Sequence, residues 1–387
     1  MGLCKYTPLA AAALFALTLA GCDWLYPESP PTDAAWTDGY KVLLVGDIDF
    51  GESYRGSDRR ILRNGYDFGF ERVAHFVRAA HLVVGNLETP IVDPVKTPSP
   101  LAGRKRYVHW ADPIKAPRHL VKQQIHVVSL ANNHTLDHGV PGLVQTLDAL
   151  AQHDVRAFGA GMTREDAEKP FETELRVDDR SFRLAIFGGF ESARRYEEEW
   201  SFYASESAPG VARLTAGRMA ELVRAYKAQN PASCIIIFPH WGANYVWKSE
   251  AQTAIAESVL TAGADAVLGH GAHTLQEIGF HGEGTVIYNL GNFVFNTPGR
   301  YAYYDVTPYS LVALLRFTAQ DGELAVHARL YPILSDNRVV EYQPRPVRDA
   351  EQATLADELA TRSGDAFSTR VRTGKDELGS FFEIRLR

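Results

Sequence analysis

The feature that most constrains this chain is a series of short apolar segments, each of which ends abruptly in residues that can bind metals. Six segments of this kind occur, and each reads as a strand that runs directly into Asp, Glu, Asn or His. The residues at these endings are Asp47 and Asp49; Asn86 and Glu88; Asn132, Asn133 and His134; His240; His270 and His273; and Asn289 and Asn292. In open α/β sheets ligands bind outside the carboxyl ends of the strands. Strands that share a sheet would therefore gather these side chains in one crevice.

The apolar strands alternate with segments of helical periodicity. Strands are predicted at 41–45, 81–84, 125–130, 155–158, 234–238, 265–268 and 285–288, and helices at 70–80, 141–153, 215–227 and 250–261. This alternation predicts βαβ units and a layered α/β protein. Segments 171–174 and 181–187 are predicted to form a hairpin or two edge strands. A second sheet is predicted from 310–317 and 324–330, and a final helix and strand (381–386) between 349 and 387.

The residue types at the strand endings indicate a metal centre. Imidazole nitrogen together with carboxylate oxygen suits Zn, Mn or Fe better than Ca or Mg. Two such ions could clamp the attacking and leaving oxygens of a phosphoryl displacement. A lone Asp or His at a strand end is usually structural, because such residues cap loops and helices, but six endings weaken that reading. We therefore expect one or two divalent metal ions, surrounded by Asp47, Glu88, Asn133, His240, His270 and His273, with His134 beside them.

Other function classes fit the sequence poorly. The chain lacks Gly-x-Gly-x-x-Gly after its first strand, the P-loop and Gly-x-Ser-x-Gly, the fingerprints of dinucleotide, nucleotide and α/β-hydrolase sites. Its 40 basic and 47 acidic residues give a net charge of −7, which argues against nucleic-acid binding. The basic clusters 104–106 and 194–195 and the acidic run 197–199 are most simply solvated surface. Alternatively, the basic clusters meet an anionic substrate.

The N-terminus indicates export and lipid anchoring. Lys5 precedes a stretch of twelve apolar residues, 9–20, which is too short to span a bilayer and suits a signal peptide. The stretch runs into Leu-Ala-Gly-Cys at 19–22, which resembles a bacterial lipobox with Cys22 as the lipidated mature N-terminus. The alternative is an ordinary secretory signal that contains a cysteine. We expect residues 1–21 to be removed and the domain to lie on the extracytoplasmic side of the bacterial cell membrane.

The segment after the lipobox and the remaining cysteine complete this prediction. Residues 22–39 contain several Pro, Ser and Asp and read as a tether between lipid and domain. Cys4 lies in the part to be removed, so Cys234 is left as a single thiol within an apolar run. Such a cysteine is most often a small buried hydrophobe, and we expect it to be inert.

The polar motifs resemble those of a known family. They are Val-Gly-Asp (45–47), Gly-Asn-Leu-Glu (85–88), Ser-Leu-Ala-Asn-Asn-His-Thr-Leu-Asp-His-Gly (129–139), Phe-Gly-Ala-Gly (158–161), His-Trp-Gly (240–242) and Leu-Gly-Asn-Phe-Val-Phe (290–295). Their sequence, order and spacing resemble the CapA-type poly-γ-glutamate capsule biosynthesis proteins of the metallophosphatase-like superfamily. The resemblance implies a four-layer α/β/β/α sandwich over residues 40–335, with its site between two sheets and a C-terminal extension over 336–387.

The resemblance also implies roles for individual residues. Asp47 matches the first metal-binding Asp, and Glu88 the second acidic position, with Asn86 as its neighbour. The pair of Asn133 and His134 matches the superfamily's Asn-His pair. The implied metal ligands are Asp47, Asp49, Asn86, Glu88, Asn133, His240, His270 and His273, and the implied acid–base residues are His134 and Asp137.

Three positions depart from the superfamily pattern. Asp49 stands where the superfamily has a His, Gly271 takes the place of a further His, and Asn244 replaces an acidic residue. These departures bear on metal occupancy and catalysis more than on the fold.

Two function classes follow from the motifs. The first is a membrane-anchored capsule-biosynthesis protein that acts on or with an anionic envelope polymer such as poly-γ-glutamate. Its expected partners are the membrane, that polymer or a phosphoester, and the capsule or envelope synthesis machinery, with no nucleic acid. The second is an exported metal-dependent phosphoesterase unrelated to capsule. Metal content and phosphodiesterase activity discriminate between them, because fold alone does not determine substrate.

Overall fold

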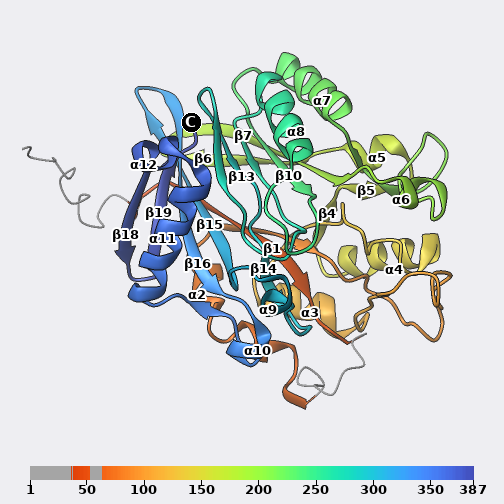
Figure 1. Ribbon diagram of the computed structural model, residues 1–387. Coiled ribbons are helices and arrows are strands. Elements are labelled where there is room, and N and C mark those ends of the chain that lie inside the picture. Colours follow the sequence, from red (N-terminus) through yellow and green to blue (C-terminus); the bar gives the residue numbers. More distant parts are fainter. Residues whose placement is uncertain (1–35, 37, 53–62) are drawn as a thin grey trace, which may run out of the picture.

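The computed structural model describes residue 36 and residues 38–52 and 63–387 (Figure 1). The predicted signal peptide, Cys22 and most of the predicted tether therefore lie outside the described residues. Among the described helices, none combines the length and apolar character needed to cross a membrane.

The larger of two main sheets is built around the long N-terminal strand β1 (Tyr40–Asp49). Its order is β18 (Val371–Asp376), β19 (Gly379–Arg385), β16 (Glu323–Leu334), β15 (Tyr309–Gln320), β1, β2 (Leu82–Leu87), β3 (Val127–Ser129) and β4 (Arg156–Phe158), with β14 (Asn292–Phe295) beside β1 and β17 (Arg345–Pro346) beside β16. β1 runs parallel to β2 and β14 and antiparallel to β15. The parallel strands thus place their carboxyl ends at one edge.

The second sheet repeats this arrangement with β10 (Cys234–His240) near its centre. Its order is β12 (Ile278–His281), β13 (Gly284–Ile287), β11 (Ala266–Leu268), β10, β7 (Arg180–Glu191) and β6 (Phe171–Val177), with β9 (Arg213–Leu214) beside β7. β10 is parallel to β7 and β11, and β6 and β7 form the predicted antiparallel hairpin. The short strands β5 (Ala160–Gly161) and β8 (Gly210–Val211) pair separately.

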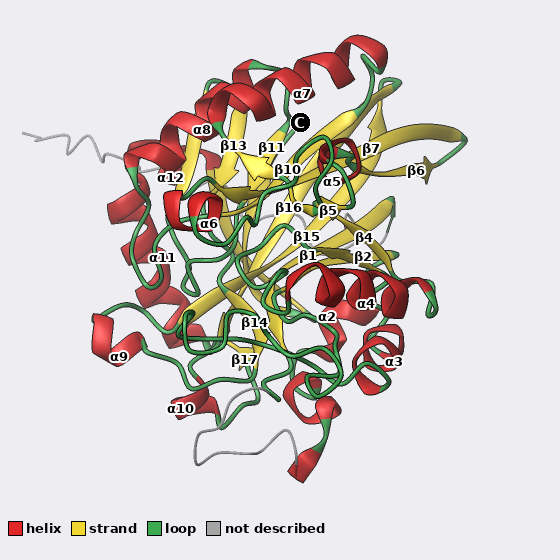
Figure 2. Ribbon diagram, turned by 90° about the vertical axis from the view of Figure 1, so that its right-hand side faces the viewer, coloured by secondary structure: helices red, strands yellow, loops and turns green. Residues whose placement is uncertain are grey.

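Neighbouring side chains of a strand point to opposite faces of the sheet, and so they pack in different layers. Leu44 of β1 and Ile236 of β10 lie in the apolar core between the two sheets. Leu43 packs on the helix side of the larger sheet, with α3 (Lys115–Lys122) and α4 (Gly139–Ala151). Ile237 packs on the outer side of the smaller sheet, beneath α7 (Ala216–Gln229) and α8 (Glu250–Thr261) (Figure 2). The expected four-layer α/β/β/α sandwich is therefore confirmed.

The helices begin where the sequence supplies caps. The Ser249 hydroxyl accepts from the backbone N–H of Gln252 at the start of α8, and the Gln252 side chain accepts from the Ser249 N–H, which completes a capping box. Thr215 caps α7 in the same way through its hydroxyl. The remaining short helices are α5 (Arg164–Glu168), α6 (Arg194–Glu198), α9 (Tyr301–Tyr304) and α10 (Asn337–Val340).

The second sheet predicted from 310–317 and 324–330 is wrong: these strands, β15 and β16, join the larger sheet, because β15 pairs antiparallel with β1 on the side opposite β2. Two further predicted elements differ from the structure. The predicted helix over 70–80 is a 3₁₀ turn, η2 (Tyr66–Phe70), followed by the short helix α2 (Ala74–Arg78). The C-terminal region contains the predicted helix as α11 (Asp349–Ser363), then α12 (Asp365–Arg370) and a hairpin of two strands where one was predicted. Leu355 of α11 and Phe382 of β19 are buried in the core between the sheets, so this region completes the sandwich.

Candidate metal centre

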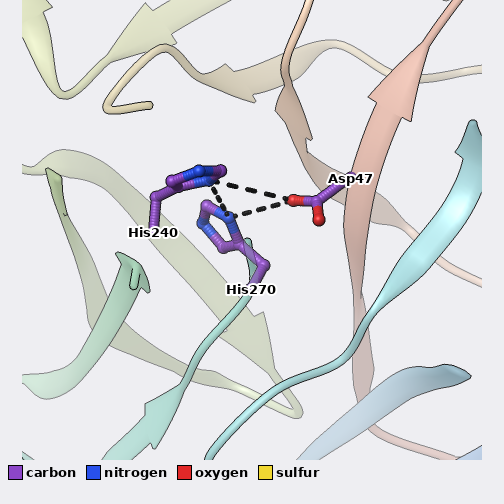
Figure 3. A group of neighbouring side chains, drawn as sticks. All are labelled: Asp47, His240 and His270. Carbon is purple, nitrogen blue, oxygen red and sulfur yellow. Dashed lines mark hydrogen bonds and ion pairs between the residues drawn. The ribbon is translucent and has the colours of Figure 1, made fainter. Parts of the chain in front are cut away.

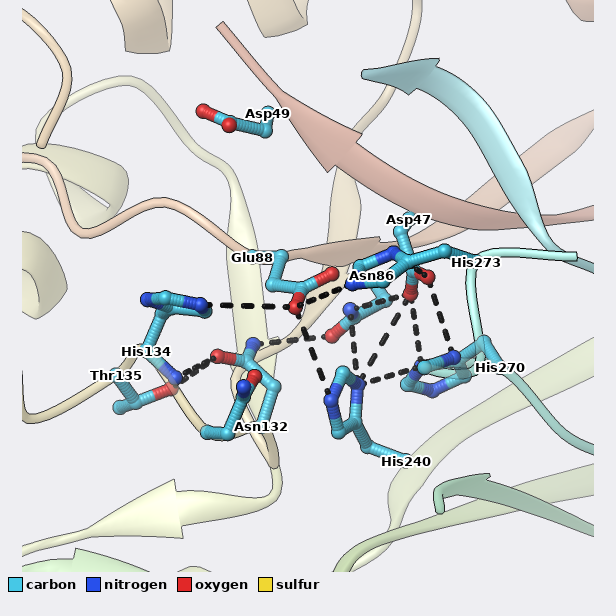
Figure 4. A network of polar contacts seen from close by, with 12 residues as sticks. Asp47, Asp49, Asn86, Glu88, Asn132, His134, Thr135, His240, His270 and His273 are labelled. Carbon is cyan, nitrogen blue, oxygen red and sulfur yellow. Dashed lines mark hydrogen bonds and ion pairs between the residues drawn. The ribbon is translucent and has the colours of Figure 1, made fainter. Parts of the chain in front are cut away.

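The carboxyl ends of parallel strands from both sheets meet at one buried cluster of polar side chains (Figure 4). Asp47 lies near the end of β1, and Glu88 directly follows β2. His240 is the last residue of β10, whereas His270 and His273 follow β11. All five side chains are buried, with at most 7% of each residue exposed. The structure thus brings together residues that are separated by more than half of the chain.

Asp47 belongs to two groups of side chains that could each hold a metal ion. One group is Asp47, His240 and His270 (Figure 3), and the other is Asp47, Glu88 and His273; within each, the ligand atoms lie within 4.8 Å of one another. Asp47 Oδ1 is 3.3 Å from His270 Nδ1, and Asp47 Oδ2 is 3.4 Å from His273 Nδ1. One carboxylate therefore faces both groups, as a ligand shared by two neighbouring ions does.

Glu88 supplies the observation that favours a cation. Its Oε1 atom lies 3.8 Å from Nε2 of His240 and of His273, and neither Glu88 oxygen has a hydrogen-bond partner among the described residues. Burial, reinforced by the negative charges of Asp47 and Asp49, raises the pKa of Glu88 well above its usual value. An unpaired buried carboxylate is costly, and a divalent cation would neutralise it. The residues present therefore fit a metal ion.

Backbone and amide donors fix the orientation of Asp47. The Asn86 side-chain amide donates to Asp47 Oδ1 at 2.9 Å, and the Gly271 N–H donates to Oδ2 at 3.1 Å. Gly271 has φ +105°, and a Cβ there would lie 3.0 Å from the His240 ring. The departure at Gly271 is thus required by close packing. Burial raises the pKa of Asp47, but hydrogen bonds from His270 and His273 outweigh it and hold that pKa far below its usual range.

The environment of His240 favours its neutral form. Burial, with the neighbouring imidazole of His270, lowers the pKa of His240 well below its usual value. His273 Nδ1 lies 2.9 Å from Asn292 Oδ1, so the last of the polar strand endings also reaches the centre. A neutral imidazole keeps a nitrogen lone pair for a metal ion, since a ligand nitrogen must be unprotonated.

In the Asn-Asn-His stretch at 132–134 the structure places Asn132 beside Asn86. The Asn132 amide donates to Asn86 Oδ1 at 3.0 Å, and its oxygen accepts from the His134 N–H at 3.0 Å. The Asn133 side-chain oxygen is buried and has no hydrogen-bond partner among the described residues. Asn132 and Asn86 thus form a two-amide relay to Asp47, and the assignment of Asn133 as a metal ligand stays a prediction.

His134 forms a carboxylate–histidine pair beside the centre. Its Nδ1 atom is 2.6 Å from Asp137 Oδ2, and its Nε2 atom is 3.9 Å from Glu88 Oε1. Burial lowers the pKa of His134 well below its usual value, with further lowering by the nearby imidazole of His109. Burial raises the pKa of Asp137, but the charge of Lys105 together with the charge and hydrogen bond of His134 outweighs it, and the net shift is downward. The neutral imidazole is thereby oriented with Nε2 toward Glu88.

Asp49 lies apart from both metal-binding groups (Figure 4). Its Oδ1 atom accepts from the Gly51 N–H at 2.9 Å, and its Oδ2 atom is 2.9 Å from His109 Nδ1. The His109 ring in turn lies 3.9 Å from the His134 ring, centroid to centroid. The Asp at the position where the superfamily has a His therefore holds a histidine from another loop next to His134.

Sequence reasoning missed two residues of the site, Lys105 and His109. The expectation that cluster 104–106 is solvated is wrong for Lys105, whose side chain is 6% exposed and 2.5 Å from Asp137 Oδ1. Its ammonium group also lies 5.4–5.9 Å from the rings of Tyr196, Trp200 and Phe202. Arg104 and Arg106 are exposed, as expected. Both missed residues lie far along the loop between β2 and α3 rather than directly at a strand ending, so the strand-ending pattern carries no signal for them.

The fold and the site together define a class: a four-layer α/β sandwich whose two sheets meet at a buried histidine–carboxylate cluster suited to divalent metals. Comparison with known families then identifies the chain. It belongs to the bacterial capsule synthesis protein family PGA_cap, whose profile matches residues 41–297. The resemblance inferred from the motifs is therefore confirmed.

Relatives of the chain carry corresponding names. Capsule biosynthesis protein CapA of Bacillus anthracis is 26% identical over 299 residues, which span 73% of this chain and 67% of the relative. PGA biosynthesis protein CapA of Bacillus subtilis (strain 168) is 28% identical over 296 residues, spanning 75% and 71%. A crystal structure described as a novel phosphatase from Mycoplasma pneumoniae covers 79% of this chain and 97% of that chain, with 11% identity and a TM-score of 0.39.

Proposed function

We propose that this protein is a membrane-anchored capsule-biosynthesis factor that binds one or two divalent metals and hydrolyses a bond in an anionic envelope polymer or its phosphoester precursor. Family membership and relatives named for capsule and PGA biosynthesis support the role. The observation that carries the metal centre is Asp47, which faces both metal-binding groups next to the Glu88 carboxylate, and that carboxylate has no hydrogen-bond partner among the described residues. Mn, Zn and Fe suit this set of imidazole and carboxylate ligands.

The bound metal would supply a Lewis acid and lower the pKa of a water molecule. Residues of the chain would position the ligands and transfer the proton. Asn86 and the Gly271 N–H hold Asp47 in place, whereas Asp137 keeps His134 in one tautomer with Nε2 toward the centre. His134 is then placed to hold or donate a proton at that nitrogen, where a leaving group needs one. Burial excludes bulk water from the site.

The test combines metal content with activity. The full chain, purified in detergent, is expected to contain at least one divalent ion per molecule and to hydrolyse bis(p-nitrophenyl) phosphate, and the His240→Ala variant to lose both. In cells, the same variant is expected to reduce the amount of surface polymer. Activity in vitro with unchanged polymer would favour the alternative, an exported phosphoesterase unrelated to capsule. A chain that binds no metal and still supports full polymer production would refute a catalytic role.

We also propose the lipid anchor, on the strength of the motif at residues 19–22. Acyl chains on Cys22 would hold the folded domain at the membrane surface, since more than one chain gives stable attachment. This would place the site beside machinery that synthesises or exports the polymer.

A further inference from the structure

Lys105 places a buried cation next to His134, the residue proposed to donate a proton. The Lys105 side chain is 6% exposed, whereas that of Lys96, in the same connection between β2 and α3, is 81% exposed. Burying an ammonium group is costly unless it is paired, and burial accordingly lowers the pKa of Lys105. The contacts that offset this cost show what the ammonium group holds in place.

The ammonium group of Lys105 spans the turn that carries His134. It donates to Asp137 Oδ1 at 2.5 Å and to the backbone oxygen of Asn133, and it lies 3.3 Å from His134 Nδ1. All three partners belong to the turn between β3 and α4. One side chain from a different loop therefore holds both ends of the segment on which the proposed proton donor lies.

The contact with Asp137 determines how the His134 ring is held. Asp137 Oδ2 lies 2.6 Å from His134 Nδ1 and accepts from the backbone N–H of His109 at 2.7 Å, whereas Oδ1 faces Lys105. Because both carboxylate oxygens are occupied, the plane of the carboxylate is fixed, and so is the imidazole ring bound to it. This leaves His134 Nε2 directed toward Glu88, 3.9 Å away (Figure 4).

Aromatic rings from a second loop enclose the ammonium group. The Lys105 Nζ atom lies 5.7 Å from the centre of the Tyr196 ring, 5.9 Å from that of Trp200 and 5.4 Å from that of Phe202. We call these three residues the aromatic cage. Ring faces attract a cation, most strongly where it is shielded from water. The cage therefore confines the ammonium group to the position from which it reaches Asp137.

We propose that Lys105 is a positioning residue for His134: it clamps the Asp137 carboxylate and thereby keeps the His134 imidazole aligned for proton transfer. His134 Nε2 passes a proton to the leaving oxygen as the bond between that oxygen and phosphorus breaks, and it recovers a proton from water. The inference rests on the proposed function and assigns a further residue to the same site. A merely structural role of Lys105 would affect all substrates alike, whereas a positioning role affects those whose leaving group needs the proton.

The test compares two phosphodiesters with different leaving groups, hydrolysed by the full chain in detergent. p-Nitrophenolate leaves bis(p-nitrophenyl) phosphate readily as an anion, whereas the phenolate of diphenyl phosphate, with a pKa of ~10 like that of tyrosine, benefits from a proton. Lys105→Met is expected to lower kcat for diphenyl phosphate by ~100-fold, the low end of what a positioned general acid contributes. The loss for bis(p-nitrophenyl) phosphate is expected to be ~10 times smaller.

Two further variants accompany this comparison. Lys105→Arg keeps a cation inside the aromatic cage and is expected to recover ~10-fold of the kcat for diphenyl phosphate that Lys105→Met loses. Lys96→Met is the matched control, because it makes the same change at an exposed position of the same connection. Its kcat for either diester is expected to change by less than ~2-fold.

Nitrogen-15 NMR of the imidazole rings tests the positioning without hydrolysis. The chain is labelled at histidine and studied in EDTA, and the His134 signals are identified by their loss in His134→Gln. Wild type is expected to show one tautomer of His134, with the proton on Nδ1, because Asp137 accepts it there. Lys105→Met is expected to lose this single form, and Lys96→Met to keep it.

Equal losses of kcat for the two diesters, or His134 signals in Lys105→Met that match those of wild type, would overturn the proposal. If Lys105→Met does not fold, Trp200→Leu removes one ring of the aromatic cage and is expected to show the same selective loss of ~3-fold for diphenyl phosphate; an unselective loss there would also overturn it. A wild-type chain that hydrolyses neither diester, but whose His134 tautomer depends on Lys105, would refute the proposed hydrolysis and still support the positioning of His134 by Lys105.

Discussion

At the scale of single residues, Asp47 has the largest expected effect, because it serves both metal-binding groups. We predict that Asp47→Asn lowers metal affinity by more than ~100-fold, beyond the usual cost of losing a residue that merely orients a ligand. Metal analysis of the purified variant after dialysis measures this directly.

Asp49→Asn is the matched control for that experiment. The substitution is the same, and the residue lies two positions away, but its carboxylate contacts Gly51 and His109 rather than the metal ligands. Metal content is expected to remain close to that of the wild type. Equal losses of metal in both variants would contradict the geometry described above.

Cys234 provides a second test at this scale. The side chain is buried in β10 in the core between the sheets, and burial raises the pKa of its thiol. We predict that a thiol reagent modifies Cys234 in the native protein only as fast as the structure opens, and rapidly in urea. Fast and complete labelling of the native chain would show that β10 is not in the position described.

What could be read from the sequence at this scale depends on strand direction. Asp47, Glu88 and His240 follow apolar strands, and a parallel strand carries such residues to a fixed edge of its sheet. The contact of Asn132 with Asn86 depends on the turn after β3, which sequence pattern does not determine. His109 comes from a loop, and its approach to Asp49 depends on tertiary packing alone.

At the scale of elements, the C-terminal hairpin is held by a buried ion-pair cluster. Arg329 of β16 contacts Asp376 at 2.6 Å and Glu383 at 2.8 Å, and Arg329 and Asp376 are 5% and 3% exposed. We predict that Arg329→Ala lowers the free energy of unfolding by ~3–5 kcal/mol, because it leaves a buried carboxylate uncompensated. Urea unfolding followed by tryptophan fluorescence measures the change.

An exposed arginine of the same hairpin gives the control. Arg372→Ala on β18 removes the same charge from a solvent-facing position and is expected to change stability by less than ~0.5 kcal/mol. If the Arg329 variant unfolds at the same urea concentration as the Arg372 variant, the cluster does not stabilise the hairpin as argued.

The elements that sequence predicted well are those buried on both faces. β1, β10 and β11 are continuous apolar runs, as strands of covered parallel sheets are. β18 was missed because its sequence, Val-Arg-Thr-Gly-Lys-Asp, is an exposed edge with no apolar alternation. The helix predicted over 70–80 was placed too long, because helical periodicity does not show at which residue a helix begins or ends.

At the scale of the whole molecule, the site exists only when the two sheets pack together. Asp47 and Glu88 come from the larger sheet, whereas His240 and His270 come from the smaller one, so metal binding and folding are coupled. We predict that saturating metal raises the melting temperature by several degrees, since ligand at ~100 times its Kd stabilises a native state by ~2.7 kcal/mol. The Asp47→Asn variant is expected to show no such shift in a thermal melt, and a full shift would place the metal elsewhere.

Attachment of the molecule to the membrane is expected to depend on Cys22. If Cys22 is the lipidated N-terminus, Cys22→Ser removes the acylated thiol and is expected to release the protein from the membrane fraction or to block its processing. Cys4→Ser is the matched control, because Cys4 lies within the segment predicted to be removed. Fractionation followed by intact-mass measurement separates the outcomes: a lipid-sized mass increment is expected for wild type and for Cys4→Ser, and none for Cys22→Ser. A Cys22→Ser protein that is processed and sediments with membranes as the wild type does would rule out lipid anchoring, and would favour the ordinary secretory signal.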